Sequence, residues 1–220
     1  MFPAYLKPVS RYFREHRNRP LVALIDELAA GRGGMIDVID VGGSIEFWLG
    51  LPRTAREKCR TTLLNLPGEY DSWPASDLKY RSEFTVLTGD ARDLSQFSDG
   101  AFDLAVCNSV IEHVGAWRDM QAAAHELTRV GKRGWVQVPA FEFPLEQHFL
   151  VPFVHWFAGP VQRKVLSVLH GNFRRRSFAE QQTSVDHTRP LTRGELQELF
   201  PDARVASEWL VLPKSHIAMW

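Results

Sequence analysis

The stretch Met35-Ile-Asp-Val-Ile-Asp-Val-Gly-Gly-Ser44 decides which fold this sequence predicts. It begins as a run of apolar, mostly β-branched residues and ends in an acid, two glycines and a serine. An apolar run that stops at paired glycines is typical of a buried strand, here roughly residues 36–41, that leads into a tight turn. Glycine lets the backbone turn sharply and lets a ligand lie against bare amide groups. A plain strand and turn of any α/β protein would show the same pattern.

The rest of the chain repeats the alternation of strand with loop or helix. Four further apolar runs end in residues typical of turns, at 61–66, 84–88, 101–107 and 135–138. Helical periodicity is clearest over 116–130, and two more strands, 203–212 and 215–220, close the chain. This order predicts an α/β, Rossmann-like fold: an open, mostly parallel seven-stranded sheet with helices on both faces and an antiparallel C-terminal strand pair. Ligands are expected outside the carboxyl ends of the strands.

The N-terminal residues, about 1–33, are expected to form a helical cap on a single domain that covers 1–220. A basic amphipathic helix should end at Pro20, and a second helix should follow over 21–30. We interpret the basic face as a solvated surface. Contact with an anionic membrane surface is the alternative.

Residues 140–190, rich in Phe, Pro, His and Trp, predict an inserted helical lid over the ligand site. Pro152 is expected to start a helix, and Gly159-Pro160 is expected to interrupt it. After the lid, Thr192 and Glu195 have the spacing of a capping box at the start of a helix.

The overall composition is that of an ordinary globular protein without net charge. The 220 residues include 26 basic and 26 acidic side chains, which gives no support for binding nucleic acid through its phosphates. Two cysteines, Cys59 and Cys107, are too few for a disulfide framework, and the N-terminus lacks the apolar region of a signal peptide. Residues 149–161 are apolar but shorter than the roughly 20 residues that span a bilayer. We therefore predict a cytoplasmic protein.

The order of these motifs resembles the class I S-adenosylmethionine-dependent methyltransferases, in particular the group often called methyltransferase type 11. Asp40-Val-Gly-Gly-Ser44 stands where that family has its acid-x-Gly-x-Gly turn, and Gly89-Asp-Ala91 stands where an acid and its neighbour hold the adenine. Residues 102–113 look like the family's fourth-strand motif, and the closing strand pair fits its reversed last hairpin. The resemblance implies S-adenosylmethionine as cofactor, bound by Asp40, Gly42, Gly43, Ser44, Asn65, Asp90, Ala91, Asn108 and Ser109.

Two positions depart from the family pattern. The first turn reads Gly-Gly-Ser instead of Gly-x-Gly, and Asn65 stands where an acid would hold the ribose hydroxyls. An amide can accept one of those hydrogen bonds, but it lacks the charge-assisted strength of a carboxylate. Glu69 is the alternative ribose ligand.

Candidate acceptor-side residues follow the fourth and fifth strands. His113 and His148 are candidate general bases because imidazole titrates near neutrality, although His113 could equally bond the backbone at a helix start. Glu146 and Trp156 are candidate substrate-binding residues. Some related methyltransferases bind a divalent cation through Glu-x-x-Glu-His after the fourth strand. Here Ser109 replaces the first acid, so we predict no metal.

The sequence therefore predicts methyl transfer from S-adenosylmethionine to a small-molecule, lipid or saccharide acceptor by direct in-line displacement. The main alternative is a non-catalytic module on a degenerate methyltransferase fold. A nicotinamide-dependent oxidoreductase is less favoured, because residues 42–47 do not match the Gly-x-Gly-x-x-Gly pattern that such enzymes use.

Overall fold

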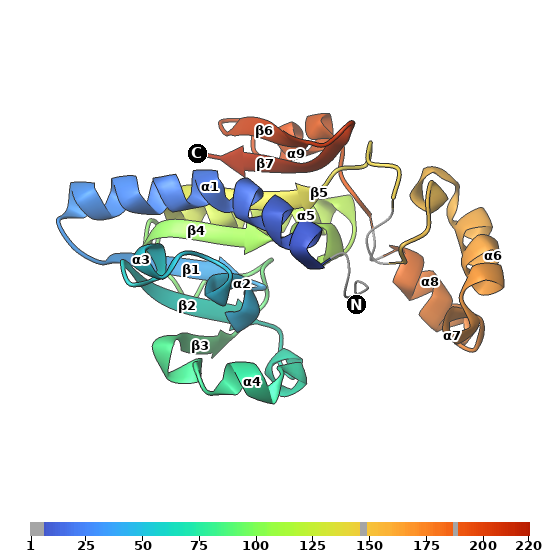
Figure 1. The fold of residues 1–220 in the computed structure, drawn as a ribbon, viewed down its shortest axis with the longest axis horizontal. Coiled ribbons are helices and arrows are strands. Elements are labelled where there is room, and N and C mark those ends of the chain that lie inside the picture. The colour runs from blue at the N-terminus through green and yellow to red at the C-terminus, as the bar shows by residue number, and fades with distance from the viewer. Residues whose placement is uncertain (1–6, 146–148, 187–188) are drawn as a thin grey trace. The chain divides into compact units, whose positions relative to one another are not determined.

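The computed structural model of the protein describes residues 7–145, 149–186 and 189–220 (Figure 1). Seven strands form one sheet in the order β3-β2-β1-β4-β5-β7-β6. β1 is parallel to β2 and β4, β2 is parallel to β3, and β6 is antiparallel to β7. The predicted fold class is thereby confirmed. The strands are β1 (Ile36–Val41), β2 (Cys59–Asn65), β3 (Thr85–Thr88), β4 (Phe102–Asn108), β5 (Gly131–Pro139), β6 (Arg204–Trp209) and β7 (Pro213–Met219).

Helices connect and flank the strands, and several of them are single turns. The α-helices are α1 (Lys7–Arg32), α2 (Ile45–Leu49), α3 (Arg53–Arg56), α4 (Ala75–Leu78), α5 (Trp117–Val130), α6 (Gly159–Leu169), α7 (Gly171–Arg174), α8 (Phe178–Asp186) and α9 (Arg193–Leu199). Short 3₁₀ turns are η2 (Glu69–Ser72), η3 (Arg81–Glu83), η4 (Ile111–His113) and η5 (Val154–Trp156).

The chain divides into two compact units. The first comprises residues up to Asp90, Leu94–Val106 and Thr128–Trp135. The second comprises Ala91–Asp93, Cys107–Leu127 and Val136–Trp220. The expectation of one domain with a cap and an inserted lid stays a prediction.

In the first unit, β1 is the most deeply buried strand. Ile36, Val38, Ile39 and Val41 are each exposed by no more than 1%. A strand buried on both faces of a parallel sheet reads as a continuous apolar run, which is why its bounds could be predicted from sequence. Its neighbour on one side is β2, with Asp40 opposite Leu63.

The N-terminal helix differs from the prediction, because α1 continues through Pro20. A proline inside a helix removes one hydrogen bond and crowds the preceding turn. Here the residues just after it are buried, among them Leu21, Leu24 and Ile25. Figure 1 shows α1, in blue, running beside the sheet, and α1 packs against β1. We attribute the continuity of the helix to this packing, which outweighs the local cost of the proline.

In the second unit, α6, α7 and α8 pack around a small apolar core that includes Leu166 and Phe173, together with Val151 and Val154 of the preceding segment. The predicted helix start at Pro152 is wrong, because the chain instead turns through Phe153, which has a left-handed φ of 63°, into η5. The predicted interruption at Gly159-Pro160 is also wrong, because α6 begins there. Proline suits the first turn of a helix, where its missing N–H has no intrahelical partner to lose.

The sequence predicted a capping box and a strand over 203–212 near the C-terminus. The capping box of α9 is present: the Glu195 amide donates to the Thr192 hydroxyl at 3.1 Å, and the Glu195 carboxylate accepts from the Thr192 amide at 2.9 Å. The strand predicted over 203–212 is shorter than expected. β6 ends at Trp209, and the apolar residues after it form the turn to β7.

Candidate active site

The turn after β1 is held against the next strand by its first glycine. Gly42 has a φ of 74°, a left-handed conformation that residues with a side chain rarely adopt. Its amide donates to the carbonyl of Leu64 at 2.7 Å, at the end of β2. The glycine therefore lets the chain leave β1 while staying bonded to β2.

Asp40, the last but one residue of β1, has a fully buried carboxyl group. Trp48 Nε1 donates to its Oδ2 at 2.8 Å. In the described part of the chain, the buried Oδ1 has no hydrogen-bond partner. Burial raises the pKa of Asp40 to about 7, and the hydrogen bond from Trp48 offsets only part of that rise. The turn thus holds a poorly solvated acid, and the described residues supply no donor for one of its oxygens.

Gly43 is required by the position of this carboxyl group. A Cβ atom at residue 43 would lie 2.2 Å from Asp40 Oδ2, which is far inside van der Waals contact. The second glycine of the Gly-Gly-Ser turn therefore provides the space in which the Asp40 side chain lies. This explains why a glycine stands at residue 43.

Ser44 acts as the N-cap of α2, because its hydroxyl accepts from the amide of Phe47 at 3.2 Å. The short helix places the indole of Trp48 within hydrogen-bonding distance of Asp40. It also brings Phe47 into a stack with Trp135, with ring centroids 6.1 Å apart. The hydroxyl of Ser44 has a structural task, and a role in cofactor binding stays a prediction.

Asn65 contacts the same turn from the end of β2. Its Nδ2 donates to the carbonyl of Gly43 at 2.8 Å. Its backbone amide donates to the hydroxyl of Tyr70 at 3.0 Å, and this hydroxyl also lies within hydrogen-bonding distance of the Leu63 and Leu87 carbonyls. Burial raises the pKa of Tyr70, so the hydroxyl stays protonated. Asn65 therefore stabilises the glycine turn.

Sequence reasoning did not identify Tyr70 or Trp48 as part of this site. Tyr70 packs edge-to-face on Trp73, with centroids 4.8 Å apart, and joins β2 and β3 to the loop that follows Asn65. The aromatic residues in an otherwise polar loop were the available signal. Glu69, the alternative ribose ligand, begins η2 just before Tyr70.

Asp90 follows the end of β3. The preceding Gly89 donates its amide to the Asn65 carbonyl at 2.9 Å, and a Cβ there would lie 3.0 Å from the Leu64 side chain. The ends of β2 and β3 are therefore tightly packed just before Asp90. Its partner in the predicted motif, Ala91, belongs to the second unit.

In the second unit, Asn108 and Ser109 stand at the end of β4. Ser109 is left-handed, with a φ of 54°, and its amide donates to the carbonyl of Gln137 at 2.9 Å. The Ser109 hydroxyl donates to Gln137 Oε1 at 2.8 Å. The buried Asn108 Oδ1 has no hydrogen-bond partner within the described ranges. Gln137 on β5 is a further contact that sequence reasoning missed, because the two residues lie far apart in the chain.

His113 and Glu112 lie together in η4. His113 Nε2 is 3.9 Å from Glu112 Oε1, and the Glu112 side chain is fully buried. Across the described residues, no group of three His, Cys, Asp or Glu side chains is arranged to hold a metal ion.

A cavity of about 500 Å³ lies within the second unit. Its lining includes Phe141, His155, Gln162, Arg189 and Glu195. Glu195 pairs with Arg189 and also serves the capping box, and Gln162 Nε2 donates to a backbone carbonyl at 2.6 Å. Most of the polar groups named here are thus already engaged by the protein.

His155 differs from these groups. Its Nε2 lies 3.0 Å from the Phe141 carbonyl, which can only accept, so Nε2 carries the proton. Nδ1, the other ring nitrogen, is buried without a partner among the described residues, and it accepts a hydrogen bond whenever it carries no proton. Trp156 Nε1 donates to the same carbonyl at 2.8 Å, although its ring is half exposed. The predicted residues His148 and Glu146 lie outside the described residues.

Polar contacts around the buried His216 join the closing hairpin to the segment after β5. His216 Nε2 lies 2.9 Å from Glu142 Oε2, and its Nδ1 lies 2.9 Å from the Ser207 hydroxyl. Burial disfavours the ionised form of Glu142, but the hydrogen bond from His216 prevails and lowers the pKa of Glu142. Because the carboxylate only accepts, Nε2 donates to it. These contacts link β6 and β7 to Glu142.

Comparison with known proteins identifies the fold. Residues 34–136 match a family model described as a methyltransferase domain. Similar solved structures include an O-methyltransferase family protein from Burkholderia thailandensis, with a TM-score of 0.55 and 13% identity over 92% of this chain and 55% of that one. The CurJ carbon methyltransferase has a TM-score of 0.54 and 9% identity over 84% of this chain and 48% of that one. PigF with SAH has a TM-score of 0.50 and 16% identity over 83% and 55%.

The chain spans about half the length of these three solved structures. No curated protein matches it. Among the described residues, no helix is both long enough and apolar enough to cross a membrane. The family match covers β1 to β4 and the first part of β5, and it includes the glycine turn after β1. Residues 34–136 are therefore similar to a methyltransferase domain, and the chain shares the fold of these solved methyltransferases.

Proposed function

We propose that this chain binds S-adenosylmethionine and transfers its methyl group directly to a small-molecule acceptor. The observation that carries the proposal is the buried Asp40 carboxyl group beside the glycine turn, whose Oδ1 has no donor among the described residues. The ammonium group of the cofactor's methionine end would supply both the missing hydrogen bond and a compensating charge. When bound, the cofactor supplies a methyl group on a positively charged sulfur.

The neighbouring residues suit that role. Gly42 and Gly43 leave the backbone of the turn without side chains, so a ligand can approach it closely. Asn65 would act mainly by holding Gly43, and Asp90 or Glu69 is then a better candidate for the ribose and adenine. The roles of Ser44, Ala91, Asn108 and Ser109 in cofactor binding stay predictions.

The cavity of the second unit is our candidate for acceptor binding. We infer that His155 accepts a hydrogen bond from an acceptor hydroxyl or amine, because its Nδ1 is the buried polar atom on that wall without a partner in the described chain. A neutral imidazole in this state can also take the proton that a hydroxyl acceptor loses. His113, His148, Glu146 and Trp156 stay candidates, and a lipid or saccharide acceptor remains a prediction.

Calorimetric titration with S-adenosylmethionine and S-adenosylhomocysteine tests the cofactor assignment, with NADH as the rival ligand. Asp40→Asn removes the charge at the turn, and Asp37→Asn makes the same change at the other end of β1, where Asp37 is paired with Arg60. We expect Asp40→Asn to weaken binding at least about tenfold, the loss of one charged hydrogen bond. Asp37→Asn should bind like the wild type. Binding of NADH alone, or unchanged binding by Asp40→Asn, would contradict the proposal.

Methyl transfer is tested with cofactor labelled in its methyl group and a panel of a phenol, a saccharide and a phospholipid. His155→Phe should slow transfer to a hydroxyl acceptor without changing cofactor affinity. His125→Phe, on the exposed side of α5, is the matched control. Cofactor binding without transfer to any acceptor would instead favour the non-catalytic module.

A further inference from the structure

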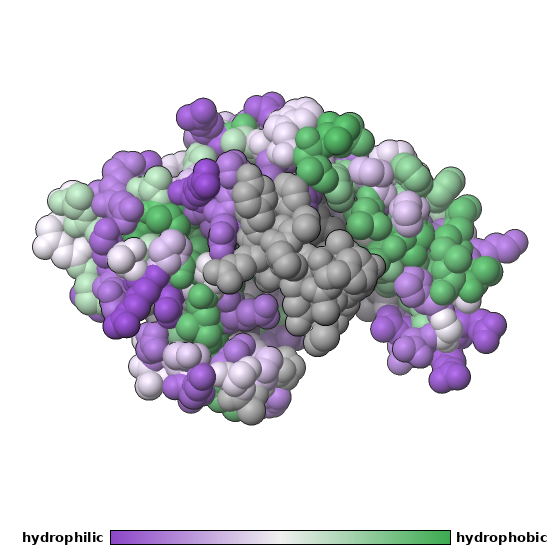
Figure 2. All heavy atoms as spheres, viewed as in Figure 1, coloured by the Kyte–Doolittle hydropathy of each residue, from purple (hydrophilic) through white to green (hydrophobic). Residues whose placement is uncertain are grey.

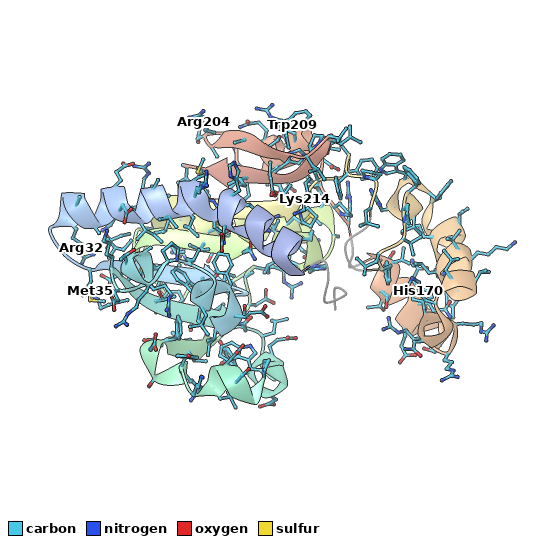
Figure 3. The ribbon with its side chains drawn as sticks, in the orientation of Figure 1. Arg32, Met35, His170, Arg204, Trp209 and Lys214 are labelled. Carbon is cyan, nitrogen blue, oxygen red and sulfur yellow. The ribbon has the colours of Figure 1, made fainter. Side chains whose placement is uncertain are left out.

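The turn between β6 and β7 exposes four consecutive apolar residues, Trp209-Leu210-Val211-Leu212. Val211 is 87% exposed, which is close to its exposure in an extended chain. Figure 3 labels Trp209 on this hairpin, and its side chain is 65% exposed. Single exposed apolar residues are common, but a contiguous run at the tip of a hairpin indicates a binding surface.

A second apolar surface lies on α6. Val161, Val168 and Leu169 are exposed, and Val168 reaches 77%. Their spacing puts them on one side of the helix with Lys164, whereas Leu166 faces the internal core of α6–α8. α6 is thus apolar on both its buried and its solvent-facing sides. Figure 2 shows hydrophobic surface, in green, over α6 and over the β6–β7 turn.

The charge near α6 is positive. Between residues 149 and 186 the sequence has five basic and two acidic residues. Arg174, Arg175 and Arg176 are exposed, and Arg163 lies over the ring of Phe178 at 4.8 Å. Phe178 is itself 69% exposed, so a cation and an aromatic ring stand together at the surface. Exposed aromatic and aliphatic residues flanked by arginine and lysine are the features with which proteins bind anionic lipid surfaces.

We propose that the second unit binds the surface of an anionic lipid bilayer through the β6–β7 tip and the exposed side of α6. The apolar residues would enter the headgroup region, and the arginines would contact lipid phosphates. Because no helix within the described residues could cross a membrane, the contact is interfacial. The positive charge beside the apolar residues favours a lipid partner over a second copy of the chain, which would place like charges together. This binding does not depend on the proposed methyl transfer.

Sedimentation with lipid vesicles tests the proposal. Vesicles of phosphatidylcholine with about 30% phosphatidylglycerol should bind the chain at least about tenfold more strongly than pure phosphatidylcholine, because the basic residues need an anionic surface. The double variant Trp209→Ser/Val211→Ser should lower binding to the mixed vesicles about tenfold. The matched control is Leu66→Ser/Leu78→Ser, which changes two exposed leucines of the first unit and should bind like the wild type.

Arg175→Glu and Arg118→Glu test the charge contribution, since both arginines are exposed and only Arg175 lies beside α6. Arg175→Glu should reduce binding to mixed vesicles severalfold, and Arg118→Glu should not. Thermal unfolding and calorimetric cofactor titration of each variant show that it is folded. Absence of vesicle binding by the wild type, or equal binding by the tip variant, would overturn the proposal. The proposal would also be overturned if the wild type formed concentration-dependent dimers instead of binding vesicles, and if the double variant Trp209→Ser/Val211→Ser abolished those dimers.

Discussion

In most proteins charged groups are exposed and apolar side chains are buried. The glycine turn after β1 and the hairpin tip between β6 and β7 depart from this pattern in opposite ways. The turn buries the carboxyl group of Asp40 completely, and the tip exposes Val211 almost completely. Both arrangements cost free energy in the isolated chain, because a buried acid loses hydration and an exposed apolar side chain orders water. A feature that costs free energy without improving the fold points to something that binds there.

The difference lies in the kind of ligand that would relieve each cost. A buried carboxyl oxygen without a donor is satisfied by one small, directional cation. Exposed apolar residues spread over a tip and a helix are satisfied only by an extended apolar phase or surface. The turn should therefore respond sharply to single-atom changes, and the tip should respond to changes in apolar area. Substitutions in the two regions should therefore differ in what they change.

Gly43→Ala should have the largest effect. The added Cβ would lie 2.2 Å from Asp40 Oδ2, so the carboxyl group or the turn has to move. We expect cofactor affinity to fall at least about a hundredfold and the free energy of unfolding to fall by about 2 kcal/mol, as for other overpacked sites. Calorimetry and urea denaturation measure the two effects.

Gly34→Ala is the matched control, because a Cβ at residue 34 would meet nothing within 4 Å. It should leave cofactor affinity unchanged. If Gly43→Ala bound cofactor like the wild type, the idea that Gly43 makes room for Asp40 would be wrong.

Asp40→Asn should separate stability from binding. The pKa of Asp40 is about 7 in the folded chain, compared with an ordinary value of 3.8. The folded chain therefore retains a proton that the unfolded chain releases, and the free energy of unfolding falls as pH rises from about 4 to about 7. The amide of Asp40→Asn does not titrate, so the variant does not lose this free energy of unfolding as pH rises. The pKa difference limits the loss in the wild type to about 4 kcal/mol. Asp40→Asn should thus be more stable than the wild type at pH 8 and similar at pH 4.

The same variant should bind the cofactor more weakly, because the ammonium group loses its carboxylate. In the wild type, binding should strengthen from pH 6 to pH 8 as Asp40 ionises. Urea denaturation at both pH values and calorimetric titration measure these trends. A variant that was less stable at pH 8 would show that the buried carboxyl group stabilises the fold after all.

Asn65→Asp tests whether residue 65 stabilises the turn or holds the ribose. Aspartate has no donor for the Gly43 carbonyl, which now receives a 2.8 Å hydrogen bond from Asn65 Nδ2. We expect cofactor affinity to fall about fivefold, which corresponds to a hydrogen bond of about 1 kcal/mol. Asn65→Ala should behave similarly. Tighter binding by Asn65→Asp would show that the acid found in the family restores a ribose contact.

The sequence predicted those parts of the molecule whose signals are local. β1 was predicted to its last residue, because a buried parallel strand is a continuous apolar run and Gly42 marks its end. The bond from Asn65 to Gly43 and the place of Tyr70 were not predictable, since they join different strands of the sheet. Pro20 and Pro160 show the same limit: packing carries α1 through one, and the other begins α6.

The hairpin tip shows why an apolar pattern alone does not reveal a binding surface. Residues 203–212 read as one strand, because apolar residues look the same in sequence whether they are buried or exposed. In the structure β6 ends at Trp209, and Val211 projects into solvent. Only the fold distinguishes a core residue from an exposed one.

Val211→Ser should have the smallest effect on stability. Because its side chain is 87% exposed, little apolar contact is lost, and the free energy of unfolding should change by less than about 0.5 kcal/mol. Leu166→Ala, in the core of α6–α8, should cost about 2–4 kcal/mol by the same urea measurement. A large loss in Val211→Ser would mean that the tip is part of the core, and the contrast with the turn would then disappear. A negligible loss leaves an apolar tip that contributes nothing to folding, and binding to another surface then becomes the physical reason for its composition.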